Sequence, residues 1–329
     1  MIIIRTPYRI PLVGGGTDLD FYYKKKGGLL ISGTFNQYIF VSLFESSQDN
    51  KISSQVLNTE LTKDIKIIKN KIFKETLKFF KIKKSFRIGT FSTLPKGSGL
   101  GSSSSLTVGL VNGIYRLFKK KKSKKKIAMI AFNIERKKLN FKGGWQDQIM
   151  ASYGGINKIK INKNGKFRVS KLDLRRSIIQ KIERHFFLIY SGITRNSSKI
   201  IKSQIKNKKK TIKIYDRIKV LVYEFEKALK KGNIYKIGKI FNEQWFLKKQ
   251  ISKEISSSSI NKFYQNLLKE KSFVGGKLIG AGGGGFFLMV SKNSKKTQNY
   301  LKRKKINFLK IRFTNSGSSQ IVNTANYKT

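Results

Sequence analysis

The segment that most constrains the fold of this chain is residues 95–105, which read PKGSGLGSSSS. Its three alternating glycines and four serines cannot contribute to an apolar core. Apolar residues then recur at helical spacing from Leu106 to Phe118, and the alternating stretch 86–94 before the loop is typical of a strand. The order of strand, glycine-rich loop and helix predicts that the loop opens onto the first turn of a helix.

A loop of this kind can bind phosphate. The first turn of a helix presents backbone N–H groups without intrahelical partners, and glycines let the backbone approach a ligand closely. The positive end of the helix dipole favours an anion at the same place. The alternative is that the segment is a flexible linker. This interpretation is less favoured, because a helix begins directly after the segment. We expect the following residues to bind a nucleotide: Lys96, Gly97, Gly99, Leu100, Gly101, Ser102, Ser103, Ser104 and Ser105.

Two other phosphate-binding patterns do not account for the sequence. The pattern G-x-x-x-x-G-K-[ST] is absent. The dinucleotide pattern G-x-G-x-x-G matches at Gly280, Gly282 and Gly285, but an apolar strand follows there where a helix is required. The second glycine-rich segment is therefore expected to close a site between two strands, or to be a plain tight turn.

Length and composition exclude several classes of protein. The 329 residues suggest two domains, and a change of composition places the expected boundary near residue 172, giving 1–172 and 173–329. The chain has no cysteine and one histidine, which excludes disulfides, thiol nucleophiles and paired-imidazole sites. No apolar run approaches the roughly 20 residues needed to cross a bilayer. We expect a cytoplasmic protein that does not bind membranes, and its oligomeric state stays open.

The charge balance is unusual, with 71 Lys and Arg against 17 Asp and Glu, a formal net charge of +54. Such a balance is typical of proteins that bind nucleic acid or anionic membranes. The lysine runs at 119–126, 206–210 and 302–305 lack the interleaved aromatic residues of a base-stacking surface. Solvated surface positions are the favoured interpretation and a polyanion-binding role is the alternative, so nucleic acid is not the expected partner.

Three segments in order resemble the signatures of the GHMP kinases, the superfamily of galactokinase, homoserine kinase and mevalonate kinase. They read TPYRIPLVGGGTDLDFYY at 6–23, LPKGSGLGSSSSLTVGL at 94–110 and KLIGAGGGGFFLMV at 277–290. Within that superfamily, GGGTD and ERKKLNFKGGWQDQIMASYGGIN most resemble the D-glycero-D-manno-heptose 7-phosphate kinases. The resemblance implies an α+β fold of two lobes. These are a mixed β/α N-terminal lobe with the phosphate loop and a ferredoxin-like α/β-sandwich C-terminal lobe, with ATP and sugar in the cleft between them.

The resemblance also implies ATP as phosphoryl donor and a Mg²⁺ ion held by Ser103 and Glu135. Oxygen ligands, water and phosphate oxygens suit this small, hard cation. The alternative for Glu135 is a surface acid paired with Arg136 or Lys137.

By the same resemblance, Asp147 in GGWQDQ is the expected catalytic base and Arg9 the cation that orients it and stabilises developing charge. An aspartate near a cation can accept the proton of a sugar hydroxyl. A helix-capping or turn role for Asp147 is the alternative.

Asp18 and the adjacent Gly15, Gly16 and Thr17 are the candidates for the sugar site. A carboxylate accepts hydrogen bonds from hydroxyl groups, and glycines leave room for a ring. Asp18 could instead cap a helix through 19–25.

A phosphate already present on the sugar would need cations, for which Arg195 is the first candidate and Lys142 a weaker one. The chain is thus expected to be an ATP-dependent kinase acting on the anomeric hydroxyl of D-glycero-D-manno-heptose 7-phosphate to give the 1,7-bisphosphate. A GHMP kinase acting on a fucose-, galactose- or mannose-type sugar is the alternative. A basic nucleic-acid-binding protein on a kinase-like scaffold is a third and less favoured one.

Overall fold

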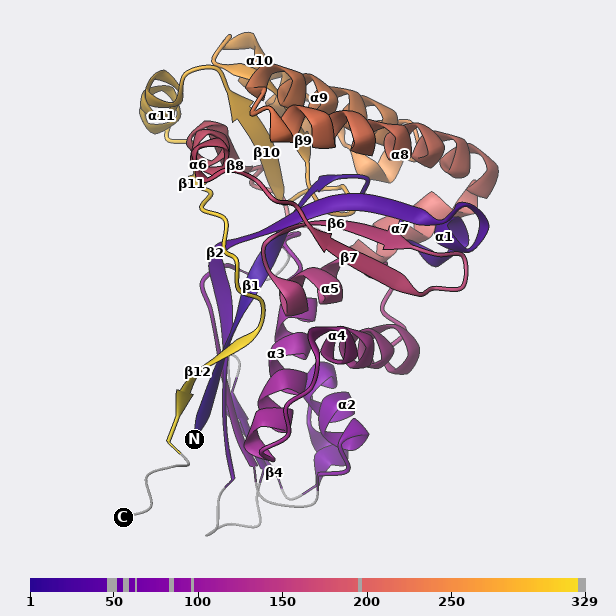
Figure 1. Cartoon of the computed structure of the whole chain (residues 1–329), viewed down its shortest axis with the longest axis vertical. Coiled ribbons are helices and arrows are strands. Elements are labelled where there is room, and N and C mark those ends of the chain that lie inside the picture. The colour runs from indigo at the N-terminus through magenta and orange to yellow at the C-terminus, as the bar shows by residue number, and fades with distance from the viewer. Residues whose placement is uncertain are drawn as a thin grey trace.

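The computed structural model describes residues 1–45, 52–55, 59–62, 64–82, 86–95, 98–194 and 197–324. These residues form two lobes, each built on one antiparallel or mixed sheet with helices against it (Figure 1). The expected α+β fold of two lobes is thus confirmed. No helix in the described part of the chain is long and apolar enough to cross a membrane.

The N-terminal lobe contains an eight-stranded sheet in the order β12-β1-β2-β5-β3-β4, with β6 on β2 and β7 on β6. The long strand β2 divides this sheet, because its first half pairs with β6 and its second half with β5. The strands are β1 (Ile2–Val13), β2 (Gly28–Glu45), β3 (Ile52–Gln55), β4 (Thr59–Thr62), β5 (Phe86–Ser92), β6 (Ile156–Ile161), β7 (Phe167–Lys171) and β12 (Ser319–Asn323).

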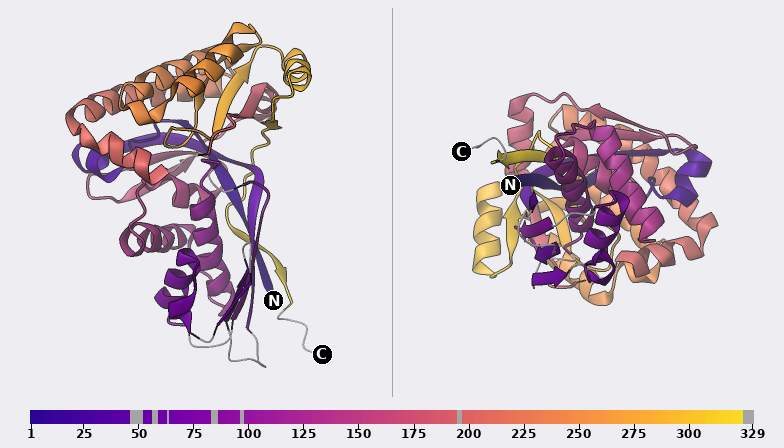
Figure 2. Two further views of the ribbon diagram at one scale, coloured as in Figure 1. Left: turned by 180° about the vertical axis from the view of Figure 1, so that it is seen from behind. Right: turned by 90° about the horizontal axis from the view of Figure 1, so that it is seen from below.

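Helices cover one face of this sheet and hold the phosphate loop (Figure 2). The central helix α3 packs on β1 and β2 and is buried on almost every side, because it is enclosed between the sheet and other helices. The helices are α1 (Asp20–Lys26), α2 (Lys71–Phe79), α3 (Ser102–Leu117), α4 (Lys124–Phe132) with a π-helical extension (Asn133–Lys138), and α5 (Gln146–Tyr153).

The C-terminal lobe has a four-stranded antiparallel sheet in the order β11-β8-β10-β9. Strands β8 and β10 read FFLIY and FFLMVS and are almost wholly buried. Helix α9 packs against β9 and β10 of this sheet, and α8 lies between α9 and the strands β1 and β2. The elements are α6 (Arg176–His185), β8 (Phe186–Tyr190), α7 (Ser197–Lys206), α8 (Lys208–Lys230), α9 (Ile234–Lys249), α10 (Ser258–Lys269), β9 (Phe273–Leu278), β10 (Phe286–Ser291), α11 (Ser294–Arg303) and β11 (Phe308–Lys310).

The end of the chain joins the two lobes. After β11 the backbone passes Phe35, which forms a bridge with Phe313, and β12 then pairs with β1 beside the N-terminus (Figure 1). The expected range 173–329 therefore includes one strand of the N-terminal sheet, and the boundary near residue 172 stays a prediction.

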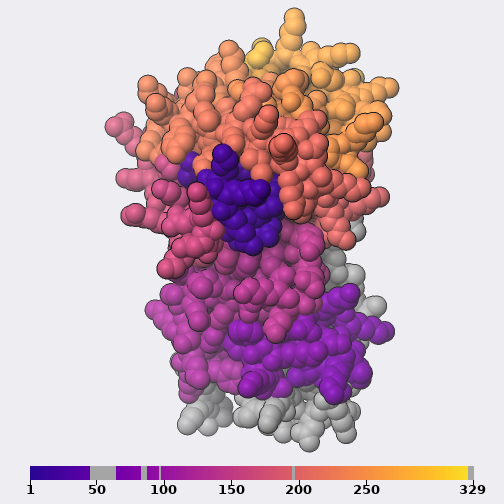
Figure 3. Space-filling view, turned by 90° about the vertical axis from the view of Figure 1, so that its right-hand side faces the viewer, coloured from indigo at the N-terminus to yellow at the C-terminus, as the bar shows by residue number. Residues whose placement is uncertain are grey.

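A second contact between the lobes lies at α1, which is exposed at their junction in Figure 3. The Tyr22 hydroxyl on α1 donates a hydrogen bond to Asp216 Oδ1 on α8, at 2.7 Å. Tyr22 also packs edge to face against Tyr215. The glycine turn before α1 is therefore held between the two lobes.

The three lysine runs lie on the surface. Residues 119–126, 206–210 and 302–305 are all exposed and lie at or between helix ends. Their exposure agrees with the interpretation of solvated positions.

Candidate active site

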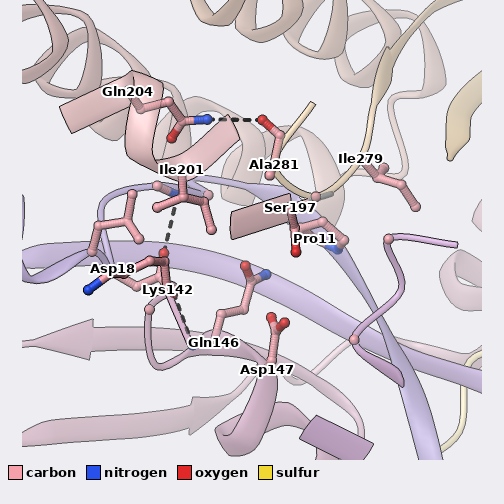
Figure 4. Close-up of a pocket in the computed structure, with 18 of the residues that line it drawn as sticks. Pro11, Asp18, Lys142, Gln146, Asp147, Ser197, Ile201, Gln204, Ile279 and Ala281 are labelled. Carbon is pink, nitrogen blue, oxygen red and sulfur yellow. Dashed lines mark hydrogen bonds between the residues drawn. The ribbon is translucent and has the colours of Figure 1, made fainter. Parts of the chain in front are cut away.

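A cavity of about 350 Å³ lies where the two lobes meet, and Figure 4 shows part of its lining. Gln146 and Asp147 project into it from α5, opposite Ser197 and Ile201 of α7 (Figure 4). We call Arg9, Asp18 and Asp147 the N-terminal wall. We call Gln244, Lys248 and Lys277 the C-terminal wall. All six residues line the cavity.

The glycine-rich loop delivers the start of α3 to this cavity. Gly99 and Gly101 have φ angles of 81° and 86°, in the left-handed region that favours glycine. Helix α3 begins at Ser102, as expected, and Ser102 and Ser103 line the cavity beside these glycines. The loop thus presents helix-terminal N–H groups to the cavity, which is the geometry of an anion site. Lys96 and Gly97 lie outside the described residues.

The four serines of the loop divide into two pairs. Ser104 and Ser105 are 1% exposed, and their hydroxyls donate to Glu135 Oε2 at 2.7 Å and to the Pro7 carbonyl at 2.9 Å. Leu100 is also buried, and its carbonyl accepts from the Arg9 backbone N–H. The hydroxyls of Ser104 and Ser105 thus anchor α3 to the protein interior, and the expected nucleotide contacts of the four serines stay a prediction.

Arg9 and Asp147 form a bidentate ion pair across 138 residues of sequence. Arg9 Nε and Nη2 donate to Asp147 Oδ1 and Oδ2 at 2.7 and 2.8 Å. Arg9 Nη1 donates to the Gly99 carbonyl at 2.6 Å, so one guanidinium holds both the aspartate and the glycine-rich loop. Arg9 is 6% exposed, whereas a quarter of the Asp147 side chain is exposed. This carboxylate is thus fixed in orientation and accessible from the cavity.

Asp147 is the second residue of α5. The N-cap residue of this helix, Trp145, makes no capping hydrogen bond with its side chain. Both oxygens of the Asp147 carboxylate accept from Arg9. The role of Asp147 as a base stays a prediction.

Asp18 lies almost fully buried at the same cavity. The backbone N–H groups of Gln146 and Gly16 donate to its two oxygens at 3.0 and 3.2 Å. Burial raises the pKa of the Asp18 carboxyl, and the charge of Asp147 raises it further against the lowering effect of the two N–H groups. Helix α1 is preceded by Leu19 without a side-chain cap, so Asp18 does not cap it. Asp18 lines the cavity.

The neighbouring glycines make room for Asp18. A Cβ on Gly144 would meet Asp18 Oδ2 at 2.0 Å, so the GG of GGWQDQ permits this carboxylate to approach α5. Gly16, with φ 101°, has no space for a Cβ because the Tyr215 ring would lie 2.4 Å away. Gly15 and Gly16 both line the cavity.

Thr17 differs from its expected role at the sugar site. It is fully buried and outside the cavity lining. Its hydroxyl donates to the Gly14 and Leu29 carbonyls and accepts from the Leu29 N–H, all within 3.1 Å. The physical reason for this correction is that the hydroxyl is fully used in holding the glycine turn against β2.

Glu135 is fully buried in the π-helical extension of α4. Its carboxylate accepts hydrogen bonds from Ser104, from Thr107 at 2.9 Å and from the Gln148 amide, and Arg136 lies 3.6 Å away. It is not a surface acid, and its direct serine partner is Ser104. Ser103, one residue earlier, is exposed to the cavity.

This donor set fits a hard cation. Glu135 and the loop serines supply oxygen ligands only, and Mg²⁺ prefers one or two carboxylates together with phosphate oxygens and water. Among the described residues, no cluster of three or more His, Cys, Asp or Glu could hold a metal by itself. A metal here would therefore depend on nucleotide oxygens, with Glu135 exchanging one of its hydrogen bonds for it.

The third glycine motif closes the cavity between β9 and β10. A Cβ on Gly285 would meet the Ser98 carbonyl at 2.6 Å, so this motif packs directly on the phosphate loop. The Ala281 carbonyl accepts from Gln204 on α7 at 3.0 Å (Figure 4). Gln204 in turn accepts from the Tyr215 hydroxyl at 2.8 Å. The motif is thereby connected to both other glycine segments.

Sequence reasoning missed several residues of the cavity. Gln146, Tyr215 and the C-terminal wall line it, and no sequence motif pointed to Gln244, Lys248 or Tyr215. Gln146 and Lys277 stand inside quoted motifs and could have been found there. Lys142 lines the cavity, and Arg195 lies outside the described residues.

A glycine-rich helix start, a guanidinium-held aspartate and a second carboxylate in one interlobe cavity define a phosphotransferase whose acceptor is an alcohol. The comparisons agree, since residues 65–155 match the family GHMP kinases N terminal domain. The D-glycero-alpha-D-manno-heptose 7-phosphate kinase of Campylobacter jejuni is 31% identical over 309 residues, covering 89% of this chain and 90% of that protein. The chain belongs to the GHMP kinases and is an ATP-dependent sugar kinase.

Solved structures agree on the fold. A D-glycero-D-manno-heptose 1-phosphate kinase from Bacteroides thetaiotaomicron superposes with a TM-score of 0.81 at 22% identity, covering 98% of this chain and 99% of the other. A putative sugar kinase from Campylobacter jejuni superposes with a TM-score of 0.74 at 25% identity, covering 97% and 98%. Both extend over both lobes.

Proposed function

We propose that this enzyme transfers the γ-phosphate of ATP to the anomeric hydroxyl of D-glycero-D-manno-heptose 7-phosphate, giving the 1,7-bisphosphate and ADP. The acceptor is suggested by the 31% identical relative, whose name is a heptose 7-phosphate kinase. The observation that carries the chemistry is the bidentate Arg9–Asp147 pair beside Gly99 of the phosphate loop. We infer a cytoplasmic location, since the reaction consumes ATP.

In this mechanism the loop and the first turn of α3 bind the triphosphate, with Ser102 and Ser103 at the cavity surface. The sugar oxygen forms a bond to the γ-phosphorus as the bond from that phosphorus to the β-phosphate oxygen breaks, and ADP leaves. Asp147 accepts the hydroxyl proton on its carboxylate. Arg9 keeps that carboxylate oriented and stabilises the charge that develops on the transferred group.

Glu135 and Ser103 would hold Mg²⁺, with Ser104 as the present hydrogen-bond partner of Glu135. When bound, this ion neutralises charge on the β- and γ-phosphate oxygens. Asp18 accepts hydrogen bonds from sugar hydroxyls, and Gly15 and Gly16 leave space for the ring. Arg195 remains the proposed cation for the phosphate that the sugar already carries, with Lys142 as a second candidate.

The test is a coupled ADP-release assay with heptose 7-phosphate, mannose, fucose and galactose as acceptors. We expect turnover with heptose 7-phosphate and at least tenfold lower kcat/KM with the free sugars, because a free sugar leaves a phosphate site empty. Phosphorus NMR of the product should show a new phosphate on the anomeric carbon. Turnover with free sugars alone, or phosphate on another carbon, would reject this acceptor.

A further inference from the structure

The side chain of Gln146 is a buried amide whose hydrogen-bonding capacity the protein does not use. Gln146 is the first residue of α5 and is 5% exposed. Its Nε2 is buried and has no hydrogen-bond partner among the residues that the structure describes. Because burying an amide without a partner costs free energy of folding, this side chain does not contribute to stability through hydrogen bonding.

The amide lies on the wall of the cavity. Figure 4 shows the Gln146 side chain projecting from α5 into the cavity, one residue before Asp147. The backbone N–H of Gln146 donates to Asp18 Oδ2 at 3.0 Å. The start of α5 thus brings three groups to one wall, namely the carboxylate proposed as the base, the amide and a second carboxylate.

Gly15 faces the same amide across open space. It lines the cavity, and its φ angle is outside the left-handed region, so its backbone conformation does not require glycine. A Cβ on Gly15 would approach only Gln146 Oε1 among the described atoms, at 3.9 Å, an ordinary van der Waals distance. Neither conformation nor packing therefore explains a glycine here. A methyl group would instead fill cavity space beside the amide, and a ligand needs that space.

The amide matches a hydroxyl group of a ligand. A primary amide donates from Nε2 and accepts on Oε1, and a hydroxyl group can both donate and accept. Half a turn about the last side-chain torsion exchanges Nε2 and Oε1, and no hydrogen bond from Nε2 to a described residue opposes this turn. Gln146 can therefore present a donor or an acceptor to a sugar, whereas an ionised carboxylate can only accept.

The place of the amide indicates which hydroxyl group it meets. Asp147 is the proposed base for the reacting hydroxyl on the anomeric carbon. Gln146 precedes it in the same helical turn, and both side chains enter one cavity, so they reach neighbouring atoms of a small ligand. The anomeric carbon has the ring oxygen on one side and C2 on the other, and of these two atoms only C2 carries a hydroxyl group.

We propose that Gln146 determines acceptor specificity by binding the hydroxyl group on C2 of the sugar, next to the reacting anomeric centre, in space that Gly15 leaves open. This inference rests on the proposed kinase function and deepens it. A sugar without this hydroxyl group leaves the buried amide unpartnered in the complex, which is how a polar site rejects an analogue. The enzyme should therefore discriminate against 2-deoxy sugars.

The first test uses Gln146→Met, which keeps the approximate length of the side chain and removes both polar atoms. Gln265→Met is the matched control, because Gln265 is an exposed glutamine on α10 in the other lobe. Steady-state kinetics with heptose 7-phosphate and with its 2-deoxy analogue give kcat/KM for each protein. Thermal unfolding of the ligand-free proteins and the Kd of a non-hydrolysable ATP analogue are measured in parallel.

We expect wild type and Gln265→Met to lose at least roughly tenfold in kcat/KM with the 2-deoxy analogue, the cost of a hydrogen bond that is not made. Gln146→Met should discriminate between the two sugars by less than about threefold, because it lacks the partner of the C2 hydroxyl group. Its Tm and its nucleotide Kd should equal those of the control. A merely structural glutamine would lower the Tm and leave the discrimination unchanged.

Gly15→Ala is a second variant, which leaves the amide intact and fills the space beside it. Its Tm should be at least that of wild type, because alanine suits the backbone here and its methyl group has room. Calorimetric titration should show the Kd of heptose 7-phosphate at least about tenfold higher, since one extra methyl group in a fitted pocket costs this much. An unchanged Kd would contradict the space assigned to the sugar.

Two results would overturn the role of Gln146. One is wild-type enzyme that uses the 2-deoxy analogue as well as heptose 7-phosphate, and the other is Gln146→Met with the discrimination of wild type. Failure of the proposed acceptor gives a different result, namely wild-type enzyme without heptose 7-phosphate turnover. The same comparison, made with the sugar that the enzyme does phosphorylate and the 2-deoxy form of that sugar, then decides on Gln146.

Discussion

The two walls of the cavity differ in how their charged side chains are paired. On the N-terminal wall, Arg9 and Asp147 neutralise each other through two hydrogen bonds, and Asp18 accepts two backbone N–H groups. On the C-terminal wall, the buried Lys277 donates to Gln244 Oε1 and has no carboxylate partner among the described residues, and Lys248 donates to the Gly280 carbonyl. The carboxylates of the first wall are thus paired without a ligand, whereas the Lys277 amine is buried without a counter-charge.

This difference suggests a division of work between the lobes. A satisfied ion pair keeps its geometry before substrate arrives, which is what a base and its orienting cation need. A buried amine without a carboxylate partner, such as that of Lys277, gains most when an anion binds beside it. The N-terminal wall is therefore expected to control turnover, and the C-terminal wall to control binding.

The largest expected effect is on the N-terminal wall. Asp147→Asn should reduce kcat by about 10²–10⁴-fold, because the amide cannot accept the hydroxyl proton. The Kd of an ATP analogue should stay within a few-fold of wild type. Steady-state kinetics and nucleotide titration measure the two quantities, with the exposed Asp173→Asn as control. An unchanged kcat would remove Asp147 from the mechanism.

Arg9→Lys tests whether orientation of the base matters. A lysine keeps the charge and loses the two-pronged contact with Asp147, so kcat should fall by roughly 100-fold as the carboxylate loses its position. In the Asp147→Asn background, Arg9→Lys should lower kcat by far less than in the wild-type background, since the two residues act as a unit. Arg5→Lys, on the same strand and stacked on Tyr38, is the control. Additive losses in the double variant would contradict the coupling.

Glu135→Gln tests the proposed metal site. The variant keeps the shape of the buried side chain and loses its charge, so the Mg²⁺ concentration for half-maximal activity should rise at least about tenfold. Thr107→Val removes only one donor to this carboxylate and should produce a smaller rise. Activity is measured over a Mg²⁺ titration at fixed ATP. An equal Mg²⁺ requirement in all three proteins would exclude Glu135 as a ligand.

The smallest expected effect is on stability and comes from the C-terminal wall. Since the pKa of Lys277 is lowered in the folded protein, the unfolded chain binds more protons between the folded and the ordinary lysine pKa. The free energy of unfolding of the wild-type protein should therefore rise with pH over that window, whose upper end is about 10.4. Lys277→Met keeps the length of the side chain and removes the buried amine, so it should raise the Tm at pH 7, and this gain should shrink as pH rises from 7 to 10. A pH-independent difference would mean that Lys277 keeps an ordinary pKa.

Much of the N-terminal lobe could be predicted because its signals are local. The glycine-rich loop and the apolar period after it predicted the helix that α3 forms from Ser102. The dipeptide Asn164-Gly165 is typical of a hairpin turn, and it stands between β6 and β7. The apolar spacing within 65–80 predicts a helix over that range, but α2 begins only at Lys71, because the Asn70 side chain accepts from the Ile72 and Phe73 N–H groups. Here a polar side chain outweighed the apolar period.

Other elements could not be predicted, because their residues gain meaning only from distant partners. Strand β12 forms because β1 offers a free edge more than 300 residues earlier in the chain. Helices α6 and α7 were not expected, although both are amphipathic. The roles of Ser104 and Thr17 likewise depend on Glu135 and Leu29, which the sequence does not place beside them.

The sequence by itself determined the class of site, because a phosphate loop needs glycines and a helix start that are contiguous in the chain. Its motifs also pointed to Asp147, Arg9 and Asp18, all three of which line the cavity. Only the tertiary structure decided that one guanidinium holds both the aspartate and the loop, and that two lysines are buried opposite them. The physical reason is that burial and charge pairing are properties of surroundings, and in a chain with 71 basic residues the identity of a lysine says nothing about its environment.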